Sequence, residues 1–75
     1  MRPDRYEVAK QFGRNLRQAR QWEGLTQREL GQRLAMNHGH LSQLENGWLC
    51  PRLLTVITLA RALDVRVGDL LDGVE

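Results

Sequence analysis

Apolar residues in this chain recur at intervals of three and four, in short blocks that open with helix-capping residues and close at glycine or asparagine. The first block places four apolar side chains on one helical face: Val8, Phe12, Leu16 and Ala19. Asp4 and Glu7 predict where this helix starts, and Gly24 follows its predicted end near Trp22. Because Gly13 inside it costs roughly 1 kcal/mol relative to alanine, we expect another segment to pack closely there.

Two short helices are predicted next. Thr26 and Glu29 have the spacing of a capping box, in which each side chain accepts a hydrogen bond from the other residue's amide. This helix is expected to end near residues 35–36, where Asn37 can cap a third helix that closes at residues 46–47. Their inward positions are spaced three or four apart: Leu30, Leu34, Leu41 and Leu44.

A fourth helix is predicted to begin at Pro51, whose fixed φ suits the first helical turn. Its apolar stripe is expected to contain Leu54, Val56 or Ile57, Leu59, Ala60 and Leu63. A last short helical turn over residues 65–71 is expected to fill the core with Val67, Leu70 and Leu71. Since no segment alternates apolar and polar residues with the period of two, the predicted fold is all-α, with four helices and a short fifth.

The 75 residues are enough for one small domain. The single cysteine, Cys50, excludes an internal disulfide, and His38 and His40 point about 200° apart on a helix, so they cannot share a metal ion. No apolar run reaches the roughly 20 residues of a membrane span, and the first dozen residues lack a signal-peptide pattern. We therefore expect a cytoplasmic protein without metal or cofactor. The sequence shows no nucleophile with a base and no paired carboxylates, so we do not expect an enzyme.

Positive charge is concentrated in the first half of the chain. Eight basic and four acidic residues precede His38, whereas three basic and five acidic residues occur from His38 onward. Ten of the eleven cations are arginine, which suits phosphate contacts. This distribution fits a polyanionic partner, and it also fits a solvated helix face.

The residue order in the middle of the chain resembles a known family. Residues 25–34 (LTQRELGQRL) resemble the opening of the Cro and phage-repressor (Xre-type) helix-turn-helix, and residues 41–47 (LSQLENG) match its end. Later positions agree as well: Pro51, Thr55, Leu59, Ala60, Ala62, Leu63, Val65, Leu70 and Leu71. The resemblance implies a lambda-repressor-like DNA-binding fold with its helix-turn-helix at about residues 27–46.

The resemblance also implies domain boundaries. Residues 12–71 would form the domain, after an N-terminal extension and helix start over 1–11 and before a C-terminal tail over 72–75. The sequence departs from the family at Gly31, where alanine is usual, and at Ala35, where glycine is usual. Since alanine in the left-handed conformation costs on the order of 1 kcal/mol, we expect either strain at Ala35 or a shifted turn.

In this family the third helix enters the major groove with its N-terminal end against the bases. The resemblance therefore assigns base contacts to four residues on the third helix: His38, Gly39, Ser42 and Gln43. The amide of Gln43 can pair with N6 and N7 of adenine, and His38 can donate to guanine N7 or to phosphate. An ordinary polar helix face is the alternative interpretation.

The resemblance assigns phosphate contacts to three residues at helix ends: Thr26, Gln27 and Asn46. Arg52 lies where relatives direct a basic side chain toward the minor groove, and a solvated arginine is the alternative. Arg20 and Glu45 are implied to form an ion pair that joins the first helix to the third.

Residues 48–50 place three apolar side chains, Trp48, Leu49 and Cys50, in a loop that would ordinarily be polar. They either cover the end of the core or contribute to self-association. For the second case, the predicted homodimer contacts are Trp48, Leu49, Val67 and Val74.

Together these features predict a small transcriptional regulator, a repressor that binds a two-fold symmetric operator in double-stranded DNA and is associated with the nucleoid when bound. An antitoxin or a restriction-modification controller would use the same fold. A protein-interaction module that no longer binds DNA is a further alternative. A separate protein partner can control any of these.

Overall fold

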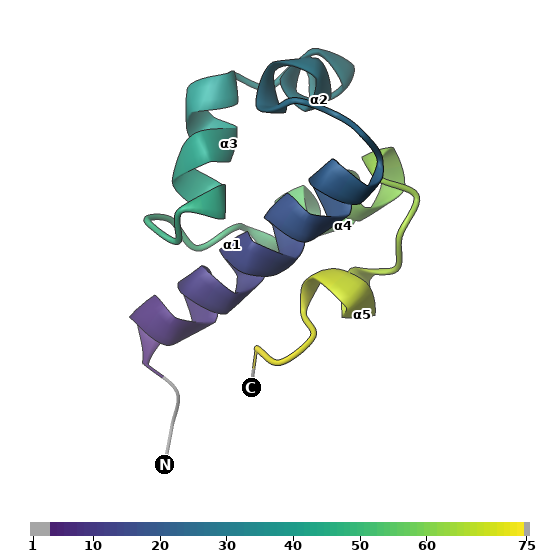
Figure 1. The fold of residues 1–75 in the computed structure, drawn as a ribbon. Helices are drawn as coiled ribbons and strands as arrows, with labels where there is room; N and C mark the ends of the chain where they lie inside the picture. The colour runs from purple at the N-terminus through teal and green to yellow at the C-terminus, as the bar shows by residue number, and fades with distance from the viewer. Residues whose placement is uncertain (1–3, 75) are drawn as a thin grey trace.

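The computed structural model describes residues 4–74. The beginning of the predicted N-terminal extension, 1–3, and the last residue of the predicted tail, Glu75, lie outside the described residues. Five helices follow one another in the chain: α1 (Arg5–Trp22), α2 (Gln27–Leu34), α3 (His38–Glu45), α4 (Leu53–Ala62) and α5 (Val67–Leu70) (Figure 1). Residues 4–74 contain no strand, and the prediction of an all-α fold with four helices and a short fifth is confirmed.

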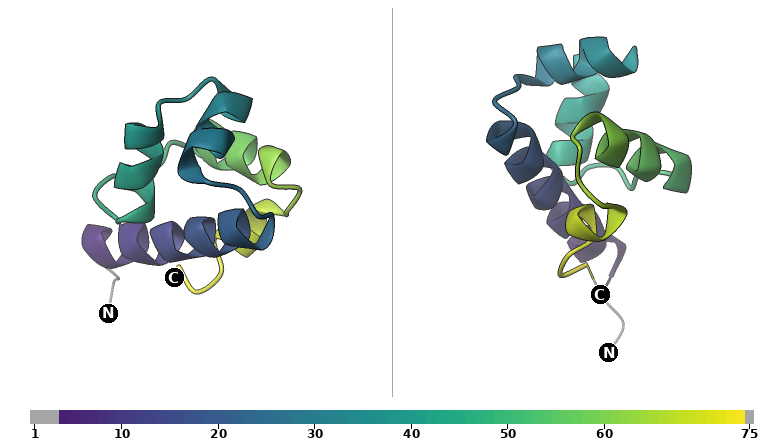
Figure 2. Two further views of the ribbon diagram at one scale, coloured as in Figure 1. Left: turned by 45° about the horizontal axis from the view of Figure 1, so that its top comes forward. Right: turned by 90° about the vertical axis from the view of Figure 1, so that its right-hand side faces the viewer.

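The long α1 helix forms one side of the domain, and the shorter helices pack around it. It contacts α3 and α5, while α2 contacts α3 and α4 (Figure 2). These helices enclose a core that is almost inaccessible to solvent: Phe12, Leu16, Leu30, Leu41, Leu44, Val56, Leu59, Ala60, Leu63 and Leu70. The α2–turn–α3 unit is therefore held from two sides.

Two predicted core positions, Leu54 and Leu71, were wrong. Leu54 is 76% exposed, whereas Val56, one of the two alternatives predicted for the next position, is buried. In the fourth helix, α4, Leu59 and Leu63 face the core. Leu54 lies about 200° around the helix axis from Val56, so Leu54 and Val56 cannot both face the core. Leu71 is 39% exposed because it follows the last residue of α5.

The start of the fourth helix also differs slightly from the prediction. Pro51 precedes the N-cap residue Arg52, and the helix begins at Leu53. The fixed φ of the proline therefore guides the chain into the helix from outside the first turn.

Side chains cap the first three helices as the sequence predicts. The Asp4 carboxylate accepts from the Glu7 amide at 2.8 Å, and Asn37 accepts from the Gly39 amide at 2.7 Å. At α2, the Thr26 hydroxyl accepts from the Glu29 amide at 3.0 Å and the Glu29 carboxylate accepts from the Thr26 amide at 2.9 Å. The hydrogen bond from the Thr26 backbone is the main reason that the pKa of Glu29 is lowered.

Four helices end in the same way. One residue after the helix adopts the left-handed conformation, and two backbone amides donate hydrogen bonds to carbonyls of the last turn. After α1 and α3 the left-handed residue is glycine, with φ of 73° at Gly24 and 76° at Gly47. After α2 and α4 it is Ala35, with φ of 51°, and Asp64, with φ of 54°. The turn of the helix-turn-helix therefore keeps its usual geometry and carries the strain that was expected at Ala35.

Gly31 explains why the turn accepts this arrangement. A Cβ atom at Gly31 would lie 2.5 Å from the carbonyl oxygen of Met36, which is a backbone atom. The Met36 amide in turn donates to the Gly31 carbonyl at 2.8 Å. The absent side chain at Gly31 lets the residue after the turn lie directly against α2.

Replacing Ala35 with glycine is expected to raise the free energy of unfolding by roughly 0.5–1 kcal/mol, because glycine adopts a positive φ without the Cβ clash. Urea denaturation measures the change. The control is Ala19→Gly inside α1, where the same substitution should lower the free energy by about 1 kcal/mol. A loss of stability at both positions would contradict the strain assigned to Ala35.

Candidate nucleic-acid interface

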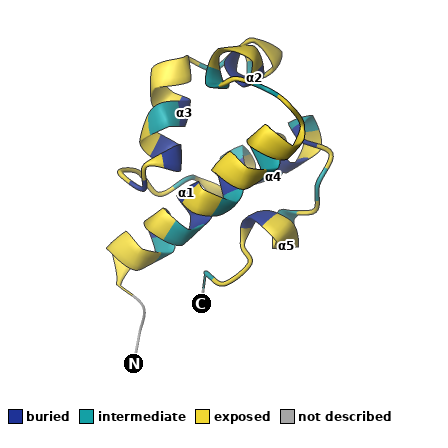
Figure 3. Ribbon diagram, viewed as in Figure 1, coloured by how far each residue is buried: buried dark blue, intermediate teal, exposed yellow. Residues whose placement is uncertain are grey.

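The third helix presents a polar side to solvent and an apolar side to the core. Leu41 and Leu44 are buried, whereas His38, Gly39 and Gln43 are exposed. Figure 3 shows this division, with exposed ribbon on the outer side of α3 and buried ribbon toward the other helices. Three of the four predicted base-contacting residues are thus accessible together on one helix.

Ser42, the fourth of these residues, is half-buried. Its hydroxyl accepts from the side-chain amide of Asn46 at 3.3 Å, so the two side chains lie together one turn apart. Asn46 itself is exposed at the C-terminal end of α3. The structure therefore places Asn46 at the opposite end of the helix from His38.

The N-terminus of α2 carries the other two predicted phosphate-contacting residues. Thr26 is exposed, but its hydroxyl already accepts the capping hydrogen bond from the Glu29 amide. Gln27 is half-buried, and its side-chain amide donates to a Glu45 oxygen at 3.1 Å. One amide hydrogen of Gln27 remains for another acceptor at a helix end whose free amides favour anions.

Glu45 is the centre of a partly buried ionic network. Its two carboxylate oxygens accept from Nε of Arg20 at 2.6 Å and from a terminal nitrogen of Arg20 at 2.9 Å. The other terminal nitrogen of Arg20 donates to the carbonyl of Leu25 at 2.7 Å. This two-pronged geometry is the strong form of an arginine–carboxylate pair.

The pair is well shielded from solvent, with side-chain exposures of 11% for Arg20 and 3% for Glu45. The hydrogen bond to Glu45 raises the pKa of Arg20, so the guanidinium stays charged. The predicted ion pair between the first and third helices is thus present. It also joins the loop before α2 and, through Gln27, α2 itself.

Gly13 sets the distance between α1 and α3. A Cβ atom there would lie 2.5 Å from the carbonyl oxygen of Glu45 and 2.6 Å from that of Leu44. The backbones of the two helices therefore touch at the C-terminal end of α3. This is the close packing that the sequence predicted at Gly13.

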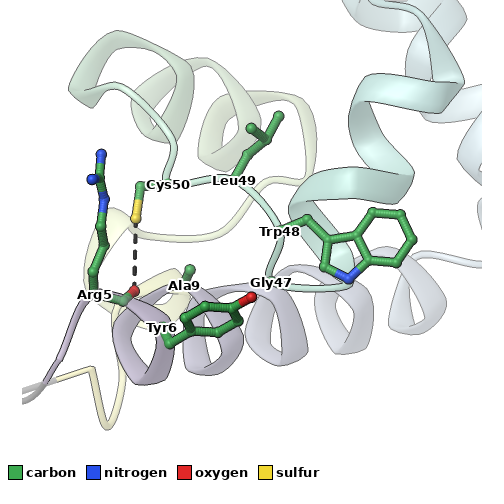
Figure 4. Close-up of a pocket in the computed structure, with 7 residues that line it drawn as sticks. All are labelled: Arg5, Tyr6, Ala9, Gly47, Trp48, Leu49 and Cys50. Atoms are coloured by element: carbon green, nitrogen blue, oxygen red, sulfur yellow. Dashed lines mark hydrogen bonds between the residues drawn. The ribbon is translucent and has the colours of Figure 1, made fainter.

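Trp48 lies in the loop between α3 and α4 and is 69% exposed, so it does not cover the core. Figure 4 shows the loop above the start of α1. A hollow of about 370 Å³ lies between them. Seven residues line that hollow: Arg5, Tyr6, Ala9, Gly47, Trp48, Leu49 and Cys50. The Cys50 thiol lies 3.8 Å from the Arg5 carbonyl, which ties the loop to α1.

The other two residues predicted at a dimer interface are less accessible. Val67 and Val74 are half-buried and pack against the core. They therefore have an intramolecular role that Trp48 and Leu49 lack. Arg52 is exposed before α4, next to His40 in a separate hollow.

Within residues 4–74, no three metal-binding side chains of histidine, cysteine, aspartate or glutamate lie together. None of the described helices combines the length and apolar character needed to cross a membrane.

Sequence reasoning missed two features of this surface. The Gln27–Glu45 hydrogen bond joins residues 18 apart, and no local pattern encodes it. The exposure of Leu54 was detectable, because Leu54 lies about 140° and 180° around the helix axis from the inward-facing Leu59 and Leu63.

This chain is similar to known proteins in sequence and in fold. The chain is 40% identical over 52 residues to the uncharacterized HTH-type transcriptional regulator y4dL of Sinorhizobium fredii. The match covers 69% of this chain and 26% of that protein, so the chain spans about a quarter of the relative's length.

Two crystal structures share the fold. The restriction-modification controller protein C.AhdI from Aeromonas hydrophila has a TM-score of 0.78 and 29% identity, over 83% of this chain and 94% of that one. The clp gene regulator ClgR from C. glutamicum has a TM-score of 0.82 and 30% identity, over 93% and 87%.

A sequence model of the family described as "Helix-turn-helix domain" matches residues 11–72, which include all of α2 to α5 and most of α1. The chain therefore belongs to the helix-turn-helix domain family, as its resemblance to the Cro and phage-repressor (Xre-type) sequences predicts.

Proposed function

We propose that this chain binds double-stranded DNA sequence-specifically and acts as a transcriptional repressor at a two-fold symmetric operator. The observation that carries the proposal is the exposed polar side of α3, on a helix fixed from behind by the Arg20–Glu45 pair and by Leu41 and Leu44. A rigid helix of this kind fits the major groove, about 12 Å wide. This role requires no catalytic activity. As part of the same proposal, the chain acts in the cytoplasm, bound to the nucleoid.

Base recognition is assigned to the exposed part of α3. Gln43 presents a free amide for adenine, and His38 lies at the N-terminal end for guanine or phosphate. Gly39 has no side chain and would let the helix approach the bases closely. Ser42 would contribute a contact beside Gln43 through its shorter side chain. The half-buried position of Ser42 makes it the least accessible of the four.

Phosphate contacts are assigned to the two helix ends that flank the groove. Gln27 would donate its remaining amide hydrogen at the start of α2, while Glu45 holds the other. Thr26 and Asn46 are the neighbouring contacts, and Arg52 would extend toward the minor groove. Such contacts orient the protein and carry no base specificity.

Control of a restriction-modification system is a second candidate role. The similarity to C.AhdI favours it, because this chain covers 94% of that controller protein. Both roles use the same DNA-binding surface, and they differ in the genes next to the operator.

In vitro selection from random duplex DNA tests the function. We expect an enriched palindrome whose half-sites are one helical turn apart, about 34 Å. The affinity should fall steeply with salt because bound counterions are released. Failure to retain any duplex at low salt would contradict DNA binding.

Two substitutions separate base from phosphate contacts on the selected site. Gln43→Ala is expected to relax one base position, with a loss of about 1–3 kcal/mol of discrimination. Gln27→Ala should weaken all sequences by a similar factor and reduce the salt slope by about one. Binding measured by fluorescence anisotropy on single-base variants checks both, and an unchanged preference in Gln43→Ala would remove Gln43 from the readout.

A further inference from the structure

A hollow of about 270 Å³ lies between the C-terminal half of α1 and the segment that includes α5. Trp22, Asp69 and Asp72 line it together with four uncharged residues: Asn15, Gln18, Ala19 and Val65. The volume would hold about nine water molecules at ~30 Å³ each, so it has room for a guanidinium or ammonium group with its neighbouring methylenes. We call it the α1–α5 hollow.

The charge of this hollow is opposite to that of the chain. Among the described residues that line it, two are acidic and none is basic, whereas the whole chain has a net charge of +2. Helix α1 also ends here, at Trp22, and the C-terminal end of a helix carries negative partial charge. Both features favour a bound cation over a bound anion.

Trp22 adds an aromatic surface to these carboxylates. It is 90% exposed, although tryptophan is highly buried on average in folded proteins. The face of an indole ring attracts a cation, and the cation is more often arginine than lysine. The planar guanidinium can stack on the ring while its N–H groups donate to a carboxylate. The combination of Trp22 with Asp69 and Asp72 therefore suits an arginine side chain.

Hydrogen bonds hold the two sides of the α1–α5 hollow in place. The side-chain nitrogen of Asn15 donates to the carbonyl of Leu70 at 2.9 Å and to that of Asp72 at 2.7 Å. The Asp69 carboxylate accepts from the Arg66 amide at 2.9 Å. The segment after α5 is thus fixed against α1. Binding would not require this segment to become ordered, which favours affinity.

Trp48 provides a comparison within the same chain. It is also highly exposed, and it lines the hollow of about 370 Å³ between the α3–α4 loop and α1. The described residues that line that hollow include Arg5 but no carboxylate. A cation is therefore favoured beside Trp22 and disfavoured beside Trp48.

The α1–α5 hollow lies away from the proposed DNA-binding surface. Helix α5 contacts α1 and α4, and Figure 1 shows α3 and α5 on opposite sides of α1. A partner bound between α1 and α5 would leave the exposed side of α3 free. Because two carboxylates repel phosphate, a nucleic acid does not fit this hollow.

We propose that the α1–α5 hollow is a docking site for another protein, which inserts an arginine side chain from a basic segment. The guanidinium would stack on Trp22 and pair with Asp69 or Asp72. Charge complementarity carries the choice of partner, and tryptophan and arginine are among the residues that most often anchor protein interfaces. The hollow is separate from α3, so the proposal does not depend on the DNA-binding role.

The experiment titrates the isotope-labelled protein with the capped peptide GGRLRGG and follows its indole N–H signals by NMR. The chain has two tryptophans, so the Trp48 signal serves as an internal control for the Trp22 signal, and Trp22→Phe assigns the two. The other probes are the capped peptide GGELEGG, the small cation spermidine and the selected DNA duplex. We expect GGRLRGG to shift the Trp22 signal to saturation and to leave the Trp48 signal unchanged.

Substitutions test the two parts of the hollow. Asp72→Asn should weaken binding of GGRLRGG about threefold, as the loss of one exposed charge pair does. Trp22→Ala should weaken it by about the same factor, measured on the backbone amide signal of Ala19. The matched control is Asp64→Asn, which removes one charge from an exposed residue outside the hollow, where asparagine tolerates the φ of 54°. Circular dichroism verifies that each variant folds.

The proposal is overturned if GGRLRGG leaves the Trp22 signal unshifted, if GGELEGG binds as tightly, or if Asp64→Asn weakens binding as much as Asp72→Asn. It is also overturned if spermidine binds more tightly than the peptide, because the hollow would then select a small cation. A Trp22 signal that moves with protein concentration in the absence of peptide would assign the hollow to a second copy of the chain, and this too overturns the proposal.

The duplex separates this proposal from the DNA-binding role. We expect the duplex to shift signals of α3 and to leave both the Trp22 signal and the peptide affinity unchanged. A duplex that displaces the peptide would overturn the docking site, because the hollow would then belong to the DNA-binding surface. If no duplex is bound, the proposed function fails, and the peptide titration still decides the role of the hollow.

Discussion

Replacing Glu45 with alanine is expected to lower the free energy of unfolding by about 3–5 kcal/mol, as breaking one side of a buried ion pair does. The guanidinium of Arg20 would keep its charge at 11% exposure and lose both hydrogen bonds to the carboxylate. Gln27 would lose its partner at the same time. A loss of this size is most of the stability of a small domain.

Denaturation in urea measures the effect, with Glu23→Ala as the control. Glu23 is an exposed acidic residue, and its replacement should change stability by less than about 0.5 kcal/mol. The double variant Arg20→Met with Glu45→Leu should recover most of the loss, because an apolar pair removes the unpaired charge. A loss below 1 kcal/mol in Glu45→Ala would mean that the pair does not hold α1 and α3 together.

The recovered double variant also tests the connection to DNA. It would keep the helices packed but leave Gln27 without its acceptor on Glu45. We therefore expect its DNA affinity to fall uniformly across sequences, as expected for a phosphate contact. Unchanged affinity would show that Glu45 has no part in orienting Gln27.

The second large effect is expected from Gly13→Ala, which should lower the free energy of unfolding by about 2–3 kcal/mol. Helix propensity alone predicts the opposite sign, a gain of roughly 1 kcal/mol. The clash decides the outcome, because the new Cβ would lie 2.5 Å and 2.6 Å from two carbonyl oxygens of α3. These are backbone atoms, so the two helices would have to separate.

Gly68→Ala in α5 is the matched control for this substitution. Nothing lies within 4 Å of a Cβ atom at Gly68, so propensity should act there alone. We expect this variant to be unchanged or more stable by up to about 1 kcal/mol. Thermal and urea unfolding compare the two, and equal stability changes at Gly13 and Gly68 would contradict the close contact between α1 and α3.

Much of the fold follows from interactions between residues close in sequence. Asp4, Thr26 and Asn37 each cap a helix by bonding an amide two or three residues away, and Gly24 and Gly47 end helices within one turn. Such contacts need no knowledge of the rest of the chain. The helix boundaries and the outward side of α3 could therefore be predicted.

The Arg20–Glu45 pair is an intermediate case. Its residues are 25 apart, and only the resemblance to the Cro and phage-repressor family implied it from sequence. The same holds for the assigned DNA contacts. Without that resemblance, the periodicity indicates where α1 and α3 lie but not which charges meet between them.

The sequence by itself determined the helices, their caps and the two apolar faces of the helix-turn-helix, because these depend on spacing within a few residues. Only the tertiary structure decided that Trp48 faces solvent, that Gly13 touches α3 and that Gln27 donates a hydrogen bond to Glu45. The physical reason is that burial depends on how whole helices are placed against one another. Several apolar residues on a helix compete for the same core, and the packing of the other helices selects among them.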